Sequence, residues 1–316
     1  MDERIRLGIS TCLLGERVRY DGGHKLDRFL RDTLGRYVDY VPVCPEVECG
    51  LPTPREALRL VGDPAHPRLV TSRSGHDVTE RMEAWARRRA AELANEDLHG
   101  FIFKSRSPSS GMERVKVYND KGVPARTGVG VFARIFIKRF PLLPVEEEGR
   151  LHDLPLRENF IERLFTLRRW RDAIASGRRR STLVRFHAAH KLLLMAHSPR
   201  MLTEAGRLVA QAKACKPAEL FGRYHGLLMR AMRLKATTKK HANVLQHAMG
   251  YFKRLLTPDE KQELLEVIDR YRREVVPLIV PVTLLSHHVR KYAPAYLRDQ
   301  VYLNPHPVEL QLRNHV

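Results

Sequence analysis

The N-terminal half of the chain alternates short apolar runs with amphipathic stretches. Four apolar runs have the length of β-strands, and the last could belong to a hairpin: Ile5–Ser10, Tyr37–Val43, Phe101–Lys104 and Arg114–Tyr118. Apolar spacing predicts a long helix over His76–Asn95, beginning near Asp77 or Thr79, and Pro54 introduces a shorter predicted helix over Glu56–Val61. Strands that alternate with helices favour an α/β layer with a mainly parallel sheet.

The pattern becomes helical from Leu154 onward. Apolar residues recur at three- and four-residue spacing in a series of segments: Arg157–Ile174, Leu183–His197, Ser198–Ala214, Ala218–Leu234, Lys239–Leu256, Pro258–Val275 and Val282–Lys291. Between the two patterns, Pro141–Pro144 and the acidic run Glu146–Glu148 predict the end of a domain. We therefore predict an α/β N-terminal domain over residues 1–150 and an all-α helical C-terminal domain over residues 151–316.

The composition is typical of a soluble globular protein, with 43% hydrophobic and 29% charged residues. No apolar run approaches the roughly 18 residues of a membrane helix. No signal-peptide core follows Met1–Arg4, so we expect a cytoplasmic protein that does not enter a membrane. Four cysteines in such a chain argue against a disulfide framework and favour metal binding or catalysis.

The net charge of +20 is concentrated in the C-terminal half. Residues 1–150 carry 26 Lys and Arg against 22 Asp and Glu, whereas residues 151–316 carry 30 against 14. A polyanion is the expected partner, and nucleic acid is favoured over membrane because the basic residues are spread over several predicted helices. The candidate RNA contacts are basic residues that alternate with amide and aromatic side chains: Arg178, Arg179, Arg180, Arg185, Lys191, Lys235, Lys239, Lys240 and Lys253.

Three loops carry the candidate chemistry, and each follows a predicted strand. Cys12 lies just after the first strand, and Cys44 and Cys49 flank Pro-Glu-Val-Glu after the second, where they could form a two-thiol metal pair. The third loop, Lys104–Glu113, contains basic residues, serines and Gly111, which suit a substrate or anion loop, although a plain turn has the same composition. Because the C-terminal ends of parallel strands meet at one edge of a sheet, we expect the three loops to lie together.

Two other features admit a functional interpretation. The glycines of Gly128–Ile137 could mark a phosphate loop, although they lack the full glycine pattern, and a helix capped by Thr127 is the alternative. Two histidine pairs have spacings that a metal could use, but no carboxylate or thiol completes either set: His187 with His190, and His241 with His247.

Three ordered motifs cover about residues 4–145: Ile9-Ser-Thr-Cys-Leu-Leu-Gly15 with Arg19-Tyr-Asp-Gly22, Cys44-Pro-Glu-Val47 with Gly50-Leu-Pro-Thr-Pro-Arg55, and Ser105-Arg-Ser-Pro-Ser109 with Gly111. Together they resemble the thiouracil/thiouridine desulfidase family (TudS type). Further motifs occur in the second half: Arg157-Glu-Asn-Phe160, His190-Lys-Leu-Leu-Leu-Met-Ala-His-Ser-Pro199, Lys239-Lys-His241 with Asn243-Val-Leu-Gln-His247, and Val276-Pro-Leu-Ile-Val-Pro281. These resemble the YbgA-like helical domain. The combination is similar to the long, RudS-type branch of the family, whose members remove sulfur from 4-thiouridine in tRNA.

The resemblance implies a [4Fe-4S] cluster held by three protein ligands, with one iron left open to bind the thiocarbonyl sulfur. The implied ligand positions are Cys12, Cys44 and Ser110. Glu46 is the implied general acid or base, with Ser107, or less so Ser109, orienting the substrate or relaying a proton. The remaining substrate-binding candidates are Lys104, Arg106, Arg55 and Tyr20. The implied product is uridine, formed with release of sulfide and no net redox change.

Ser110 departs from the family pattern, in which the third loop reads Ser-Pro-Ser-Cys-Gly. A serine hydroxyl is a harder and less acidic donor than a thiol, which should loosen the cluster or leave it absent. Three explanations remain open: Cys49 supplies the third thiol, the protein is a natural member with impaired or altered chemistry, or Ser110 is an engineered replacement. A non-catalytic RNA-binding protein is a separate alternative if Ser110 prevents cluster assembly. A desulfidase of free thiouracil or thiouridine monophosphate is a further alternative, although it would not need the basic C-terminal domain.

Overall fold

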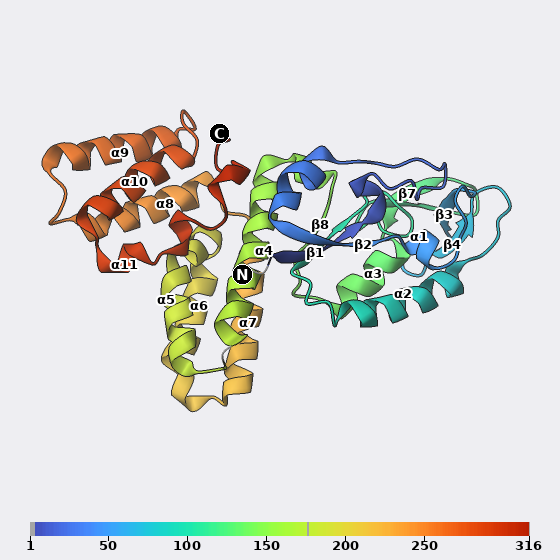
Figure 1. Ribbon diagram of the computed structural model, residues 1–316, viewed down its shortest axis with the longest axis horizontal. Coiled ribbons are helices and arrows are strands. Elements are labelled where there is room, and N and C mark those ends of the chain that lie inside the picture. Colours follow the sequence, from blue (N-terminus) through green and yellow to red (C-terminus); the bar gives the residue numbers. More distant parts are fainter. Residues whose placement is uncertain (1–3, 176, 316) are drawn as a thin grey trace. The chain divides into compact units, whose positions relative to one another are not determined.

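The structure is a computed structural model that describes residues 4–175 and 177–315 (Figure 1). Residues up to Asp153 form one compact unit, and residues from Leu154 onward form a second. The first unit contains both β-sheets, whereas the second is helical throughout its described part, which confirms the predicted α/β and all-α classes. The α-helices described in the first unit are α1 (Pro45–Glu48), α2 (Thr79–Leu93) and α3 (Val131–Arg139).

One sheet has the strand order β2-β1-β5-β8, and every neighbouring pair in it is parallel. Its strands are β1 (Ile5–Ser10), β2 (Val38–Val43), β5 (Gly100–Phe103) and β8 (Val145–Glu147). The first three coincide with predicted apolar runs. Because the strands all run in the same direction, the loops that follow them leave from a single edge of the sheet.

Aromatic side chains on β5 and α3 fix this helix against the sheet. The ring of Phe101 lies 5.7 Å from that of Phe132 and 4.8 Å from that of Phe136, measured between centroids. The neighbouring strand must make room for Phe101, because a Cβ atom on Gly8 would lie 2.2 Å from its ring. Helices α2 and α3 lie side by side against this sheet (Figure 1).

The second sheet has the order β4-β3-β6-β7. Its strands are β3 (Leu58–Val61), β4 (Arg68–Thr71), β6 (Val115–Tyr118) and β7 (Pro124–Gly128). The prediction of a helix over Glu56–Val61 is wrong, because Leu60 is buried while Arg59 stacks on the Tyr118 ring, an alternation typical of a strand. The antiparallel β6–β7 pair confirms the predicted hairpin, whereas β4 lay outside every predicted element.

The acidic run Glu146–Glu148 completes the parallel sheet and is not a linker. Val145 pairs with Phe101, and the register continues through Glu147. The three glutamates are buried, with 6%, 5% and 9% of their surface exposed, because each carboxylate has polar partners. A strand of three residues with two acidic side chains has no apolar periodicity, so the sequence pattern could not predict it.

The second unit contains the helices that apolar spacing predicted, with most ends shifted by a few residues, and one short helix at Ala295–Arg298 that was not predicted. They are α4 (Leu154–Ala175), α5 (Arg180–His197), α6 (Pro199–Ala210), α7 (Pro217–Arg233), α8 (Thr238–Met249), α9 (Pro258–Arg272), α10 (Ile279–Tyr292) and α11 (Ala295–Arg298). The helix predicted to end at Leu256 ends at Met249. Side-chain caps define several starts: Ser198 and Thr237 each accept a backbone N–H, and Thr257 forms a reciprocal capping box with Glu260. Pro281 is tolerated in α10 because it lies in the first turn.

The histidines that suggested a metal have other roles. His187 and His241 each bond a tyrosine hydroxyl through Nδ1, at 3.1 and 3.0 Å, and His190 Nδ1 bonds the Phe186 carbonyl at 2.8 Å. Burial lowers the pKa of His187 to about 4 and the pKa values of His190 and His241 to about 3, so all three are neutral at pH 7. Within the described ranges, neither predicted pair belongs to a group of three metal-binding side chains.

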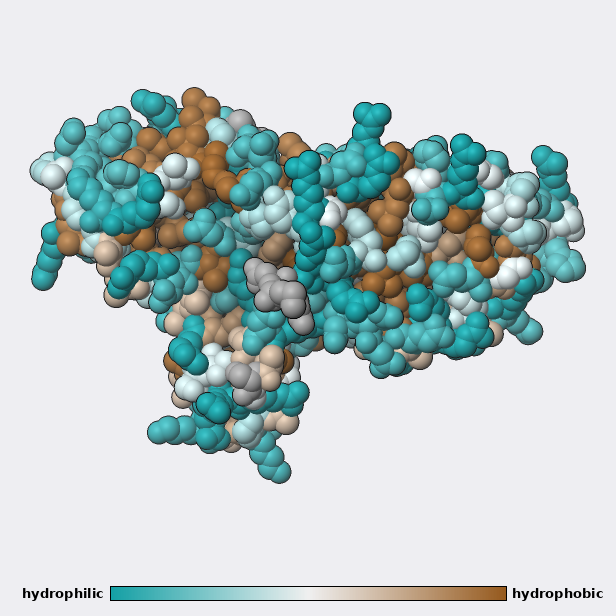
Figure 2. All heavy atoms as spheres, viewed as in Figure 1, coloured by the Kyte–Doolittle hydropathy of each residue, from teal (hydrophilic) through white to brown (hydrophobic). Residues whose placement is uncertain are grey.

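Hydrophilic side chains cover most of the face shown in Figure 2, with smaller hydrophobic areas between them. Among residues 4–175 and 177–315, no helix combines the length and the apolar character that crossing a membrane requires.

Acid should destabilise the helical unit, because its buried neutral histidines take up protons only when it unfolds. A histidine with a depressed folded pKa stabilises the fold above its unfolded pKa of about 6.5, and this contribution disappears as the pH falls toward the folded pKa. Between pH 6.5 and 5, His190 and His241 should each remove about 2 kcal/mol from the free energy of unfolding. Urea unfolding of a Trp85→Phe chain, followed by Trp170 fluorescence, measures this loss.

The control is His241→Asn, which keeps a hydrogen-bonding group beside Tyr302 but cannot titrate. It should be less stable at pH 7 yet lose less stability on acidification, because one fewer proton is taken up. If the His241→Asn chain lost as much stability on acidification as the chain with His241, His241 would not be the neutral buried group that takes up a proton on unfolding.

Candidate active site

The C-terminal ends of β1, β2 and β5 meet at a cavity of about 310 Å³. The cavity is lined by every predicted metal-binding and catalytic residue except Cys49: Cys12, Cys44, Glu46, Ser107, Ser109 and Ser110. It is also lined by the predicted substrate-binding residues: Tyr20, Arg55, Lys104 and Arg106. The three loops that follow separate strands therefore meet, as the parallel order of the sheet requires.

Cys12 is held in a short 3₁₀ turn, Thr11–Leu14, that continues directly from β1. The turn ends at Gly15, whose φ of 103° lies in the left-handed region that favours glycine. Burial raises the pKa of the Cys12 thiol to about 11, even though the positive charge of Lys104 opposes the shift. Without a metal, this thiol is therefore protonated at neutral pH.

Cys44 is the N-cap residue of the single-turn helix α1. Pro45 occupies the first helical position, where its missing N–H costs nothing, and Glu48 Oε1 accepts the Cys44 N–H at 2.7 Å. Arg81 of α2 donates to the Cys49 carbonyl at 2.6 Å, which fixes the other end of the turn. Burial raises the pKa of the Cys44 thiol, so it also favours the protonated form until a cation replaces the proton.

Glu46 points its carboxylate into a network of side chains on the cavity wall. Arg55 donates to Glu46 Oε2 from both Nε, at 3.0 Å, and Nη2. Ser109 Oγ donates to Glu46 Oε1 at 2.8 Å and lies 2.9 Å from Ser107 Oγ. Arg55 is itself held by the Val18 carbonyl at 3.1 Å, so the guanidinium orients the carboxylate from a fixed position.

The third loop rests on the N-terminus of α3. The backbone N–H groups of Val131 and Phe132 donate to the Pro108 and Ser109 carbonyls at 3.1 and 2.9 Å. Gly130, and not the predicted Thr127, is the N-cap residue of α3, and it has no side-chain cap. The helix does form, but its first N–H groups are already bonded to the loop, which argues against a phosphate site there.

Two glutamates at the end of β8 hold this loop from the other side, and their role was not predicted. Glu148 accepts hydrogen bonds from Lys104 Nζ and, at 2.6 Å, from the Ser105 N–H. Glu147 accepts the Met112 N–H at 2.6 Å. The acidic run is the only sequence signal for them, and it could not be interpreted because the strand β8, to which Glu147 belongs, was not predicted.

Cys49 lies outside the cavity. Its side chain belongs to the apolar core of the first unit, with 9% of the residue surface exposed, and its thiol donates to the Glu46 carbonyl at 3.3 Å. The helix α1 separates the two thiols, so Cys44 and Cys49 do not face one shared site as a two-thiol pair would. Supplying Cys49 as the third cavity thiol would require α1 to rearrange.

The rim of the cavity is aromatic and basic. Tyr20 is 42% exposed, and the guanidinium of Arg19 lies 5.4 Å from the centre of its ring. Arg106 is exposed, whereas Lys104 is paired with Glu148. Arg19 and Lys25 also line the cavity, although the sequence motifs did not single them out as site residues.

Most of the candidate RNA contacts are exposed on the helical unit: Arg178, Arg179, Arg185, Lys191, Lys235, Lys239 and Lys253. Two have intramolecular hydrogen bonds: Arg180, which is also exposed, and Lys240, which is half-buried. Arg180 donates to the Ala212 carbonyl at 2.9 Å. Lys240 Nζ donates to the His197 carbonyl at 2.8 Å, so its ammonium is less available for a ligand than those of its neighbours.

Residues 7–148 match the family model of 2-thiouracil desulfurase. The chain is 32% identical over 108 residues to the uncharacterized protein YbbK of Bacillus subtilis (strain 168), covering 33% of this chain and 71% of YbbK. The chain belongs to the 2-thiouracil desulfurase family. A solved structure of the [4Fe-4S]-dependent thiouracil desulfidase TudS is 32% identical and aligns over 49% of this chain and 97% of that chain, with a TM-score of 0.39.

The helical unit of this 2-thiouracil desulfurase family member also has relatives. Residues 191–307 match the model of a family of unknown function, DUF1722. The uncharacterized protein YbgA of Escherichia coli (strain K12) is 29% identical over 153 residues, which cover 48% of this chain and 90% of YbgA. The predicted resemblance to a TudS-type family with a YbgA-like domain is thereby confirmed.

A methyl group at position 130 should displace the third loop of this desulfurase family member. The Cβ atom of alanine would lie 2.6 Å from the Ser109 carbonyl group and 2.7 Å from the Ser110 nitrogen, both backbone atoms that cannot rotate away. Gly130→Ala should therefore lower the free energy of unfolding of the first unit by about 1–3 kcal/mol. Urea unfolding of a Trp170→Phe chain, followed by Trp85 fluorescence, measures the change.

Gly222→Ala provides the matched control, because its Cβ atom would meet open space on α7. In a Trp85→Phe chain it should leave the stability of the helical unit unchanged or raise it by up to about 1 kcal/mol. Equal effects of the two substitutions would show that the loop does not rest on α3.

Proposed function

We propose that the protein is a [4Fe-4S]-dependent desulfidase that converts 4-thiouridine in tRNA to uridine and releases sulfide. The observation that carries the proposal is the convergence of Cys12, Cys44 and position 110 on one cavity that also contains Glu46. Family membership supports the reaction class, and the similarity to the [4Fe-4S]-dependent thiouracil desulfidase TudS supports the cofactor. The reaction exchanges sulfur for the oxygen of water, so it needs neither an oxidant nor a reductant.

Two of the three proposed ligand positions in this cavity offer the thiol that an iron-sulfur cluster requires. Cys12 and Cys44 offer thiols on separate loops, and their raised pKa values indicate that a metal must displace the protons when it binds. Ser110 offers a hydroxyl, a harder and less acidic donor that should hold iron more weakly than a thiolate. We therefore assign the cluster to Cys12, Cys44 and Ser110, with reduced occupancy caused by the third donor. When bound, the cluster would supply an iron atom that accepts the departing sulfur.

The residues of the chain supply the proton transfers and the orientation of the base. Glu46 would accept a proton from the water that attacks C4 of the base, because its carboxylate faces the cavity and Arg55 holds it in place. Ser109 and Ser107 form a hydrogen-bonded relay that could return a proton to the departing sulfur or to N3 of the base. Tyr20, half exposed at the rim, offers a ring on which the base can stack.

Transfer RNA as the substrate is supported by the charge of the helical unit. Residues 151–316 carry 30 Lys and Arg against 14 Asp and Glu, which attracts a polyanion at long range, and most of the candidate contacts are exposed. A cavity of about 310 Å³ accommodates one nucleotide, so the thiouridine would have to leave its base stack to enter.

Two alternatives have specific support. The family description and the TudS relative both name thiouracil, which favours free thiouracil or thiouridine monophosphate as the substrate. Ser110 favours a protein that binds RNA without catalysis, because a cluster-free cavity has no acceptor for sulfur. The alternatives differ in which substrates react and in whether restoring a thiol at position 110 restores turnover.

Restoring the third thiol should increase cluster content. After anaerobic reconstitution with iron and sulfide, Ser110→Cys should bind about four irons per chain, and the unsubstituted chain should bind fewer. Iron and acid-labile sulfide analysis measures occupancy. Turnover is followed by the loss of 4-thiouridine absorbance from tRNA and from free 4-thiouridine monophosphate. We expect Ser110→Cys to act on tRNA with the higher kcat/KM.

Cys12→Ser combined with Ser110→Cys is the matched control, because it restores one thiol while removing another and should again bind less iron. If Ser110→Cys gains no iron, the cluster does not belong to this cavity. Equal kcat/KM for tRNA and the monophosphate would instead identify a small-molecule desulfidase.

In the Ser110→Cys background, Glu46→Gln should lower kcat by about 10²–10⁴-fold while leaving iron content unchanged, because the amide cannot take up the proton. Glu48→Gln is the control, since Glu48 lies on the same turn, caps the Cys44 N–H and does not line the cavity. Comparable losses from the two substitutions, measured by steady-state kinetics, would remove Glu46 from its assigned role.

A further inference from the structure

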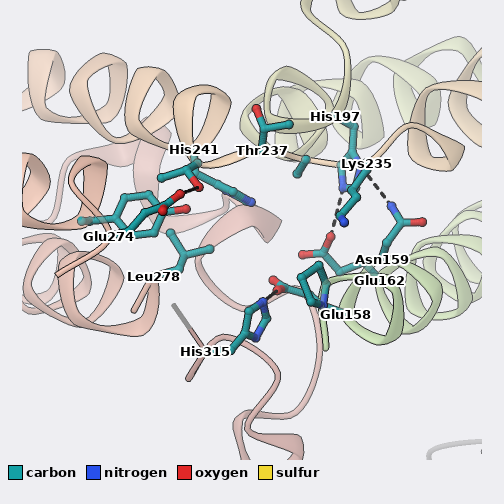
Figure 3. A pocket seen from close by; sticks show the side chains of 14 residues that line it. Glu158, Asn159, Glu162, His197, Lys235, Thr237, His241, Glu274, Leu278 and His315 are labelled. Carbon is teal, nitrogen blue, oxygen red and sulfur yellow. Dashed lines mark hydrogen bonds and ion pairs between the residues drawn. The ribbon is translucent and has the colours of Figure 1, made fainter. Parts of the chain in front are cut away.

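The helical unit encloses a second cavity, of about 330 Å³, which the desulfidase reaction does not use. It lies between α4, the turn that joins α7 to α8, and α9 (Figure 3). Its lining combines apolar and aromatic side chains, Pro155, Tyr271 and Leu278 among them, with a larger number of polar and charged ones. A cavity of this size lies at the lower end of the range typical for small ligands.

The polar lining of the cavity includes two buried glutamates that already have partners. Arg313 donates to Glu158 Oε1 at 3.2 Å and to Glu162 Oε1 at 2.9 Å, and His197 Nε2 lies 3.0 Å from Glu162 Oε2. Glu158, Glu162 and His306 are spaced closely enough to hold a metal ion. The guanidinium that bridges both carboxylates opposes a second cation, so we do not assign a metal here.

The two glutamates differ in their surroundings. Burial raises the pKa of Glu158, and the nearby charge of Glu162 adds to the shift. Although burial alone would raise it, His197 and Arg313 hold the pKa of Glu162 below its usual range. His315 Nε2 also lies 3.6 Å from Glu158 Oε2, so both carboxyl groups line the cavity as hydrogen-bond acceptors held in place by basic neighbours.

His241 extends this edge. Its Nδ1 is bonded to the Tyr302 hydroxyl, and Figure 3 shows its ring pointing into the cavity, where Nε2 can form one more hydrogen bond. Burial keeps the ring neutral by lowering its pKa to about 3. A ligand that fits this edge must offer hydrogen-bond donors to the carboxyl oxygens and a partner for the imidazole nitrogen, side by side.

The lining offers an ammonium group to an anion, although it also contains the carboxylate of Glu274, which accepts a hydrogen bond from the Thr238 hydroxyl at 3.3 Å. Lys235 reaches into the cavity and, within the described part of the chain, forms no ion pair. Thr237 caps α8, a helix of 12 residues whose N-terminus lies at the same cavity, and its hydroxyl accepts the Lys240 N–H at 3.4 Å. The ammonium group and the positive end of the helix would both attract a phosphate.

A planar group with adjacent donors and acceptors, an apolar face and an attached anion describes a nucleotide. We propose that this cavity binds one unpaired nucleotide of an RNA, with the base beside Glu158 and His241 and the phosphate at Lys235. The inference rests on the proposed tRNA substrate. It adds a second binding position, separate from the desulfidase cavity, that recognises a base and not only the charge of the phosphate backbone.

Ala236→Phe tests the proposal in the full-length protein, because it places a ring in the cavity without changing charge. Ala218→Phe, on the exposed first turn of α7, is its matched control. Lys235→Ala removes the ammonium charge, and Lys261→Ala removes an exposed charge from α9 that does not line the cavity. The measurements are fluorescence anisotropy with labelled tRNA and thermal shifts with AMP, CMP, GMP, UMP or inorganic phosphate, after circular dichroism has verified folding.

We expect Ala236→Phe and Lys235→Ala to weaken tRNA binding by about fivefold or more, and each control by less than about twofold. At least one nucleoside monophosphate should raise the Tm of the wild type more than inorganic phosphate does, and Ala236→Phe should abolish the difference. If wild type and Ala236→Phe bind tRNA equally, the inference fails while the tRNA substrate stands. Nucleotide binding with unchanged tRNA affinity would assign the cavity to free nucleotides, and a wild type that binds no tRNA would overturn both proposals.

Discussion

The active-site cavity depends on the backbone contact between the third loop and the start of α3. The loop after β5 bears position 110 and both serines of the relay, and the α3 N–H groups bind its carbonyls. This arrangement satisfies two sets of groups at once, because a helix leaves its first N–H groups unpaired and an irregular loop leaves its carbonyls unpaired. Aromatic packing fixes α3 against β5, and the loop that is bonded to α3 is thereby held in place relative to the core.

The part of the site that could be predicted from sequence lies at the ends of regular strands. Cys12 and Cys44 follow β1 and β2, whose apolar runs are continuous, so the parallel order alone brings their loops together. The Glu46 network was partly predictable, because the motif contains both Glu46 and Arg55. Their ion pair spans only nine residues.

The unpredicted part depends on pairing between distant segments. The strand β8 exists because Val145 pairs with Phe101, 44 residues earlier in the chain, and its acidic side chains are buried only because the third loop supplies donors. Leu58–Val61 was mistaken for a helix for the same reason, since four residues cannot show a period until their partner strand is known. Cys49 could not be separated from Cys44 by spacing, because the single turn of α1 directs one thiol to the cavity and the other to the core.

The shape of the cavity depends on the backbone at position 110, whereas its capacity to bind a metal depends on the side chain there. The contacts that place this residue involve its backbone: its N–H bonds Ser107 Oγ at 3.2 Å, and the space beside its nitrogen is kept open by Gly130. Serine and cysteine differ by a single atom, so either side chain can occupy the position without moving the loop. The Glu46 network makes no use of the side chain at position 110 and is complete with serine present. Under the proposed function, a serine here would lower the affinity for iron while preserving the arrangement that would orient a substrate.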